Sequence, residues 1–267
     1  MRGGLMRKAL FFDIDGTILS DITGTIPQSA VDALQRTKEL GNLTFINTGR
    51  TICSIPKELK GIPFSGYLCG CGTYIMVGDQ VLFSRSIPHE RGREIIDLLY
   101  RYHAVPVLEG SQDCYFPERM TRFEGAEHTR RYFRPMGLGI ETYIENDNFD
   151  FDKFVFYYDE QTDLAAVKRN LERDMELIDR KNGFYEVVPK GFSKASAIAF
   201  VLEHYGMEME NAYVFGDSSN DLAMFQYVPH AVAMGTHNPV LDPYTEYVTR
   251  TVEQDGIAFA MKHFGLI

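Results

Sequence analysis

Short, mostly apolar runs alternate with segments of helical periodicity at both ends of the 267-residue chain. Such runs predict buried strands where turn residues bound them, and apolar positions three or four apart predict helices. The predicted strands cover residues 8–12, 42–46, 67–70, 212–215 and 231–235, with a hairpin over 73–83. The predicted helices cover residues 27–40, 51–59 with a break near Pro56, 193–206, 221–228 and 255–264. This alternation is typical of a parallel α/β sheet.

The middle of the chain has a different pattern. Strands predicted over residues 105–109, 138–144, 154–158 and 184–188 mostly alternate apolar and polar positions, and helices are predicted over 89–103 and 162–174. Such alternation fits an antiparallel sheet with one solvated face. We therefore expect an α/β fold in which residues 1–84 and 189–267 form a Rossmann-like parallel-sheet core domain and residues 85–188 form an inserted α+β cap domain.

Composition places the chain among soluble globular proteins, since 45% of its residues are hydrophobic and 24% are charged. The net charge of −10 argues against nucleic acid as the main partner, because phosphate backbones need clustered lysine and arginine. The apolar stretches are shorter than the roughly 20 residues of a membrane helix. Asp13 also interrupts the N-terminal apolar run too early for a secretion signal. We expect a cytoplasmic protein with no membrane partner, and the sequence favours no particular oligomeric state.

The four cysteines, Cys53, Cys69, Cys71 and Cys114, are too few and too irregularly spaced for a disulfide framework. Cys69 and Cys71 form a C-x-C pair, not the C-x-x-C of zinc knuckles or redox motifs. We interpret all four as buried thiols.

Carboxylates follow two of the predicted parallel strands. Asp13 and Asp15 end the first strand, and residues two apart on an extended chain point to the same side. Asp217 follows the strand over 212–215. Ligands of open α/β sheets bind beyond the carboxyl ends of the strands, and clustered carboxylates suit a hard cation of the Mg²⁺ type. Asp13–Gly16 alone also fits a capped Asp-Gly turn.

Groups suited to a phosphate lie at two other predicted ends. Thr48, Gly49 and Arg50 follow the second strand, and Lys194 lies in the first turn of a helix. A hydroxyl and backbone N–H groups can hold phosphoryl oxygens while a lysine and a divalent cation offset their charge. One carboxylate can then attack phosphorus and another can carry the proton. Taken singly, Lys194 also fits a solvated helix residue and T-G-R a common loop.

Several motifs taken together are far more specific than any one of them alone. In chain order they are FFDIDGTIL, FINTGR, EVVPKGFSKASAI and YVFGDSSNDLAMF, followed by AVAMG and EYVT…DGIAFAM. With these motifs in this order, the chain resembles the haloacid dehalogenase-like superfamily, and within it the Cof-type phosphatases of subfamily IIB with a C2B-type cap. The resemblance covers the core domain nearly end to end and includes the insertion point of the cap. One departure is CGCGTYI, where relatives usually show an Asn-Gly pair, and this change is expected to alter how the core meets the cap.

The resemblance implies a role for each matching carboxylate. Asp13 corresponds to the nucleophile. Asp15 corresponds to the general acid and base, and its backbone carbonyl also reaches the metal. Asp217 corresponds to a side-chain ligand of Mg²⁺, which Asp13 and Asp15 also bind.

The resemblance also implies a phosphate-binding set. Thr48, the Gly49 backbone, Lys194 and Asn220 correspond to groups that bind the transferring phosphoryl group, with Lys194 also stabilising the charge on the nucleophile. Asp221 and Arg50 are expected to support this set.

A basic segment stands out in the predicted cap, at ERMTRFEGAEHTRRYFRP (118–135). One interpretation is a solvated basic helix face. The other is a specificity segment for an anion or sugar phosphate, formed by Arg119, Arg122, Arg130, Arg131 and Arg134.

The resemblance therefore implies a Mg²⁺-dependent phosphatase that hydrolyses small phosphorylated metabolites, such as sugar phosphates or phosphorylated cofactors, through an aspartyl-phosphate. Two alternatives stay open: a phosphomutase, and a non-catalytic regulatory protein that binds a phosphorylated metabolite. The cap type favours hydrolysis over the mutase, and the complete set of Asp13, Asp15, Lys194 and Asp217 argues against a pure binder.

Overall fold

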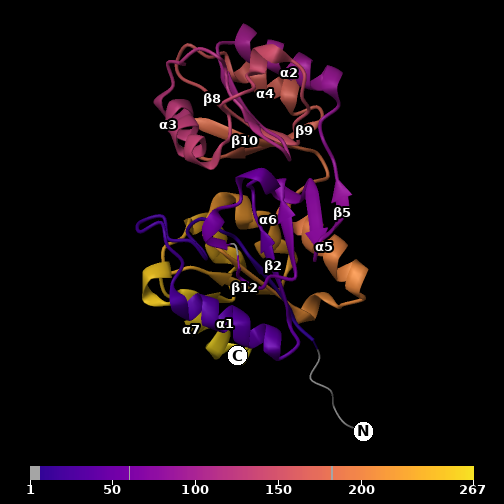
Figure 1. Ribbon diagram of the computed structural model, residues 1–267, viewed down its shortest axis with the longest axis vertical. Helices are drawn as coiled ribbons and strands as arrows, with labels where there is room; N and C mark the ends of the chain where they lie inside the picture. The colour runs from indigo at the N-terminus through magenta and orange to yellow at the C-terminus, as the bar shows by residue number, and fades with distance from the viewer. Residues whose placement is uncertain (1–6, 60, 182) are drawn as a thin grey trace. The chain divides into compact units, whose positions relative to one another are not determined.

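A computed structural model describes residues 7–59, 61–181 and 183–267, which form two compact units (Figure 1). Unit 1 comprises the described residues of Met1–Gly49, Pro56–Phe83 and Ser193–Ile267. Unit 2 comprises Arg50–Ile55 and Ser84–Phe192 and thus includes a short segment that directly follows Gly49. The assignment of residues 1–84 and 189–267 to a catalytic core, and of 85–188 to a cap, stays a prediction about roles.

Unit 1 is built on an eight-stranded sheet with the order β13-β12-β11-β1-β2-β3-β4-β5. From β13 to β3 neighbouring strands are parallel, and β4 is antiparallel to β3. The strands are β1 (Ala9–Phe12), β2 (Leu43–Asn47), β3 (Gly66–Cys69), β4 (Tyr74–Val77), β5 (Gln80–Ser84), β11 (Ala212–Gly216), β12 (His230–Ala233) and β13 (Tyr247–Val248). This arrangement confirms the predicted parallel α/β sheet, with the wholly buried β1 between β11 and β2.

Helices cover both faces of this sheet. They are α1 (Gln28–Glu39), α5 (Lys194–Tyr205), α6 (Leu222–Tyr227) and α7 (Gly256–His263). Residues of α5 and α6 cluster with Phe11 and Phe45 on one face. On the other face Tyr213 contacts Phe264, which follows α7, and α7 packs against α1. Among the described residues, no helix is long and apolar enough to cross a membrane.

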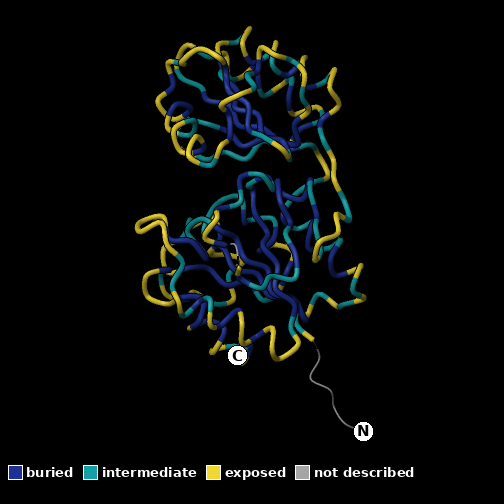
Figure 2. The backbone as a smooth tube through the Cα atoms, in the orientation of Figure 1, coloured by how far each residue is buried: buried dark blue, intermediate teal, exposed yellow. Residues whose placement is uncertain are grey.

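Unit 2 contains a five-stranded antiparallel sheet with the order β7-β6-β8-β10-β9. Its strands are β6 (Val105–Glu109), β7 (Cys114–Tyr115), β8 (Lys153–Tyr157), β9 (Met175–Asp179) and β10 (Phe184–Pro189), and its helices are α2 (His89–Arg101), α3 (Glu124–Phe133) and α4 (Leu164–Leu171). Phe154 and Phe156 of β8 cluster with α2 and α4, whereas Val155 and Tyr157 cluster with α3. Both faces of β8 are therefore buried, and the expectation of one solvated face is wrong for this strand. Figure 2 shows the burial of each described residue along the backbone.

Two predicted elements differ in the structure. The helix predicted over residues 51–59 is a pair of 3₁₀ turns, Ile52–Ser54 and Lys57–Leu59, on either side of Pro56, which has no N–H to continue a helix. The strand predicted over 138–144 is irregular: Gly139 has a φ of +67°, outside the strand region, and pairing is limited to an isolated β-bridge between Tyr143 and Phe116. Sequence patterning also missed β7, β9 and β13.

The first testable prediction concerns the core of unit 1. Phe45 is fully buried and stacks on Phe11 with ring centroids 5.2 Å apart. Phe45→Ala should lower the free energy of opening of the β1 amides by about 3–5 kcal/mol, through lost burial and the cavity left behind. Native-state hydrogen exchange in increasing urea measures this energy. The control is Ile22→Ala, since Ile22 is 83% exposed. Equal effects of the two substitutions would contradict the assigned core.

Candidate active site

The candidate site lies where β1 and β11 end. Their register pairs Phe12 with Phe215, so the residues that follow them lie side by side at the carboxyl edge of the sheet. The Asp13 N–H donates to the carbonyl of Phe215 at 3.0 Å, which extends the pairing into the site. Asp217 follows Gly216, the last residue of β11. Residues about 200 positions apart thus meet because the two strands are parallel neighbours.

Lys194 connects the first turn of α5 to these strand ends. Its side chain is fully buried, and its Nζ lies 2.8 Å from Asp13 Oδ1 and 2.6 Å from Asp221 Oδ1. The Ser193 hydroxyl caps α5 by accepting from the Ser196 N–H at 3.1 Å. The side-chain amide of Asn47, at the end of β2, donates to the Lys194 carbonyl at 3.0 Å. The cap and the amide hold the start of α5 so that its buried ammonium reaches two carboxylates.

Asp221 hydrogen bonds to the backbone of the loop that carries it. Its Oδ2 accepts from the backbone N–H groups of Asp217 and Ser218, each at 2.9 Å, while Oδ1 accepts from Lys194. A Cβ at Gly216 would lie 2.6 Å from Asp221 Cγ, so only glycine fits there. Asp221 therefore contacts both the Asp217 backbone and Lys194, and its supporting role stays a prediction.

Three carboxylates crowd around a single ammonium. Oxygens of Asp13, Asp217 and Asp221 all lie within 4.8 Å of one another. Burial, with repulsion from neighbouring carboxylates, raises the pKa of Asp13 to about 7 and that of Asp217 to about 8. Burial alone would lower the pKa of Lys194, but Asp13 and Asp221 outweigh it and raise that pKa. Among the described residues, these three carboxylates outnumber the ammonium of Lys194 that pairs with two of them.

Gly16 and Thr17 orient Asp217, a role that sequence reasoning missed. The Thr17 hydroxyl donates to Asp217 Oδ1 at 3.2 Å. Gly16 has a φ of +70°, and a Cβ there would lie 2.6 Å from Asp217 Oδ2. The glycine is thus needed both for its backbone conformation and for the carboxylate packed against it. The D-G-T run that begins at Asp15 was the available signal, but the sequence did not show which side chain Gly16 and Thr17 would meet.

The other predicted core residues lie on neighbouring segments. Thr48 is buried after β2, where its N–H donates to Leu68 and its carbonyl accepts from Cys71. Asp15 is half-buried, and its backbone forms an isolated β-bridge with Leu19. Its carboxylate is not one of the three that cluster. Asn220 is half-buried, and its Oδ1 accepts from the Ser218 hydroxyl at 2.8 Å.

Arg50 is placed differently from the residues before it. Thr48 and Gly49 belong to unit 1, whereas Arg50 begins the segment that clusters with unit 2. Its guanidinium donates to the Tyr132 hydroxyl at 2.9 Å and to the Ser54 carbonyl at 3.2 Å. The predicted support of the phosphate by Arg50 stays a prediction.

The CGCG turn contacts the start of α5 within unit 1. Cys71 is buried with a φ of +53°, and it contributes to the raised pKa of Lys194. A Cβ at Gly72 would lie 2.7 Å from the Ser193 carbonyl oxygen. This departure from the family pattern thus packs under the helix that carries Lys194, a contact the sequence had not indicated.

Most of the predicted basic segment in unit 2 is already paired. Arg122 contacts Asp159 at 2.7 Å, Arg130 contacts Glu127 at 3.1 Å, and Arg131 contacts Glu124. The remaining two, Arg119 and Arg134, are exposed. These pairs favour the interpretation of a solvated basic face, and a specificity role for the five arginines stays a prediction.

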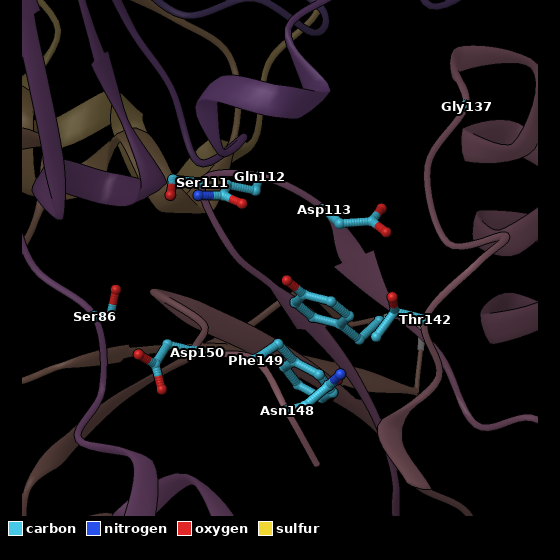
Figure 3. A pocket seen from close by; sticks show the side chains of 10 residues that line it. Ser86, Ser111, Gln112, Asp113, Gly137, Thr142, Asn148, Phe149 and Asp150 are labelled. Atoms are coloured by element: carbon cyan, nitrogen blue, oxygen red, sulfur yellow. The ribbon is translucent and has the colours of Figure 1, made fainter. Parts of the chain in front are cut away.

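Unit 2 also contains a polar pocket of about 540 Å³, shown in Figure 3. Hydroxyl, amide and carboxylate groups dominate its lining, and no lysine or arginine is among the residues that line it. The polar groups include Ser86, Gln112, Asp113, Asn148 and Asp150. This lining suits a hydroxyl-rich or cationic group better than an anion.

Comparison with known proteins agrees with this geometry. A family model described as haloacid dehalogenase-like hydrolase matches residues 10–261. The chain is 28% identical to YkrA, named as a phosphatase of Bacillus subtilis (strain 168), over 97% of this chain and 98% of YkrA. It is 26% identical to YcsE of the same strain, named 5-amino-6-(5-phospho-D-ribitylamino)uracil phosphatase, over 97% of this chain and 96% of YcsE.

Solved structures give the same result over the whole chain. BT4131, described as a sugar phosphatase of HAD subclass IIB, matches with a TM-score of 0.83 and 27% identity, covering 97% of this chain and 100% of that one. BT1666 from Bacteroides thetaiotaomicron matches with a TM-score of 0.85 and 26% identity, covering 100% of this chain and 98% of that one. The chain therefore belongs to the haloacid dehalogenase-like hydrolases and, within them, to the Cof-type phosphatases of subclass IIB.

Proposed function

We propose that the protein is a Mg²⁺-dependent phosphatase that hydrolyses small phosphorylated metabolites through an aspartyl-phosphate on Asp13. The observation that carries this proposal is the buried ammonium of Lys194 between Asp13 and Asp221, beside the carboxylate of Asp217. A buried lysine next to a carboxylate that must attack an anion is the arrangement that phosphoryl transfer needs.

The chemistry of the donors fits a hard divalent cation. Asp13 and Asp217 would hold Mg²⁺ with their carboxylates, joined by the backbone carbonyl of Asp15 as the family resemblance implies. Asp221 is already committed to Lys194 and to two backbone N–H groups. When bound, the cation would offset the charge of the phosphate and favour the ionised form of both ligands, whose pKa values burial raises.

The residues of the chain then divide the reaction between them. In the first step, a carboxylate oxygen of Asp13 bonds to phosphorus, the bond from phosphorus to the substrate oxygen breaks, and Asp15 gives that oxygen a proton. In the second step, water attacks phosphorus, Asp15 takes the proton from the water, and the bond to Asp13 breaks to release phosphate. Thr48, with the Gly49 N–H, would hold the phosphoryl oxygens, and Lys194 keeps Asp13 in place.

The substrate class we propose is a phosphorylated sugar or polyol, or a phosphorylated cofactor of similar size. Two relatives support it: BT4131 is described as a sugar phosphatase, and YcsE is named for a phosphoribityl compound. A phosphomutase would use the same aspartyl-phosphate, and product analysis on a panel of sugar phosphates distinguishes it by isomerised phosphate esters.

The second prediction tests the nucleophile and the metal. The purified protein should hydrolyse p-nitrophenyl phosphate with Mg²⁺, and EDTA should abolish the activity until Mg²⁺ is restored. Asp13→Asn should lower kcat more than about 1,000-fold, because an amide oxygen is a poor nucleophile. The control is Asp32→Asn on the exposed side of α1, which should keep wild-type kcat. Substantial turnover by Asp13→Asn would refute the assignment, whereas an inactive wild type across the whole panel would favour a binding protein.

The third prediction concerns stability against pH in metal-free protein. Asp13 and Asp217 titrate near 7 and 8 when folded, above the ordinary aspartate pKa of about 3.9 in the unfolded chain. The folded state then binds more protons, so the stability these groups contribute is present below pH 4 and is lost as pH rises through 7 and 8.

Calorimetry should therefore show the Tm of the metal-free protein falling between pH 5 and pH 8.5. At pH 8, Mg²⁺ at 100 times its Kd should restore about 2.7 kcal/mol. Asp217→Asn should flatten the pH profile and weaken the response to Mg²⁺, whereas Asp32→Asn should leave both unchanged. A Tm that rises steadily with pH in the absence of metal would contradict the charge imbalance described for the site.

A further inference from the structure

Two cysteines from distant segments of the chain meet in unit 2. Cys53 lies in the 3₁₀ turn Ile52–Ser54, and Cys114 begins β7. We propose that Cys53 and Cys114 are a redox-active pair and that a low-molecular-weight disulfide such as oxidised glutathione converts them to an intramolecular disulfide. This modification site is independent of the phosphatase chemistry.

Several contacts hold Cys53 against the strand end that carries Cys114. The Cys53 thiol donates to the Gly110 carbonyl at 3.3 Å. The Gly110 N–H donates to the Asp113 carbonyl at 2.9 Å and closes the turn that leads into β7. Cys53 also packs on the apolar cluster that contains Cys114, and the register of β6 and β7 pairs Cys114 with Glu109, the residue before Gly110. The Cys53 side chain therefore lies against the strand end that carries Cys114, although none of the four cysteines, all in the described part of the chain, forms a disulfide.

The two thiols differ in access and in acidity. Cys53 is half-buried, which corrects the expectation that all four cysteines are buried, and Cys114 is 0% exposed. The interaction with Cys114 lowers the pKa of Cys53, whereas the interaction with Cys53, together with burial, raises the pKa of Cys114. The more acidic and more accessible thiol attacks first in thiol–disulfide exchange. Cys53 is therefore the attacking residue and Cys114 the resolving one.

The exchange balances in two steps. The Cys53 thiolate bonds to one sulfur of oxidised glutathione, whose S–S bond breaks to release one glutathione thiolate. The Cys114 thiol then loses its proton and attacks Cys53 Sγ, and the mixed S–S bond breaks to release the second glutathione. The two protons of the cysteines end on the two glutathione thiols, and two electrons pass from the protein to glutathione.

The disulfide would join two parts of unit 2 that otherwise meet only by noncovalent contacts. Cys53 lies in Arg50–Ile55. This segment directly follows Thr48 and Gly49, which are proposed to hold the phosphoryl group. Oxidation would tie this segment to β7. Reduction would release it.

The fourth prediction uses mass spectrometry of the full-length protein. The protein is equilibrated in glutathione buffers of rising oxidised fraction, alkylated in acid-quenched samples, and digested with trypsin without reduction. Trypsin separates the cysteines, because Cys53 lies in the peptide 51–57, Cys69 and Cys71 share the peptide 61–85, and Cys114 lies in the peptide 102–119. We expect a cross-link between peptides 51–57 and 102–119 that dithiothreitol removes.

Single substitutions test the order of attack. Cys114→Ser should stop the exchange at a mixed disulfide of glutathione with Cys53, with Cys114→Ala as a second variant if serine disturbs the buried position. Cys53→Ser should leave Cys114 reduced, and the matched control Cys69→Ser should keep the cross-link. The proposal is overturned if Cys53 stays alkylated in every buffer, if the wild type stops at the mixed disulfide, or if the only cross-link lies within peptide 61–85. The readout is mass, so a protein without phosphatase activity would test the proposal equally well.

Discussion

The ammonium of Lys194, buried between Asp13 and Asp221, is the interaction on which the site depends. It joins β1, the loop after β11 and the first turn of α5, so one charge fixes three segments drawn from both ends of the chain. Burying these charges has a large desolvation cost, and removing only one partner would leave the others unpaired in a low-dielectric environment. The start of α5 is accordingly held in place by the serine cap, by the Asn47 amide and by the close packing of Gly72.

The parallel sheet turns this local arrangement into a site. β1 lies between β11 and β2, so the ends of these three strands deliver Asp13, Asp217 and Thr48 to one edge. The loop after β11 then folds back on itself, with Asp221 accepting from the N–H groups of Asp217 and Ser218. The loop that carries Asp217 is thus ordered by its own backbone contacts, and a ligand would not have to organise it.

The sequence predicted the fold class and most of the elements of unit 1, because short apolar runs such as those of β1 and β11 are bounded by turn residues and leave little choice of structure. It placed Asp13, Lys194 and Asp217 at element ends, where the sheet topology brings them together. The prediction failed for elements that tertiary contacts determine. β7 and β13 are too short to show an alternating pattern, and Gly139 interrupts a run that reads as a strand. Ion pairing of Arg122, Arg130 and Arg131 was equally invisible, because each partner depends on the fold and not on a motif.

Gly16 shows how far one of these contacts reaches. The carboxylate of Asp217 packs directly against the Cα of Gly16, so a methyl group at that position would collide with it. About 200 residues separate the two positions in the sequence. A side chain at position 16 would therefore displace the carboxylate of Asp217. A larger residue at position 16 would strain the backbone there and would also require the loop after β11 to move, so a single substitution in the D-x-D-G-T run would disturb a loop about 200 positions away.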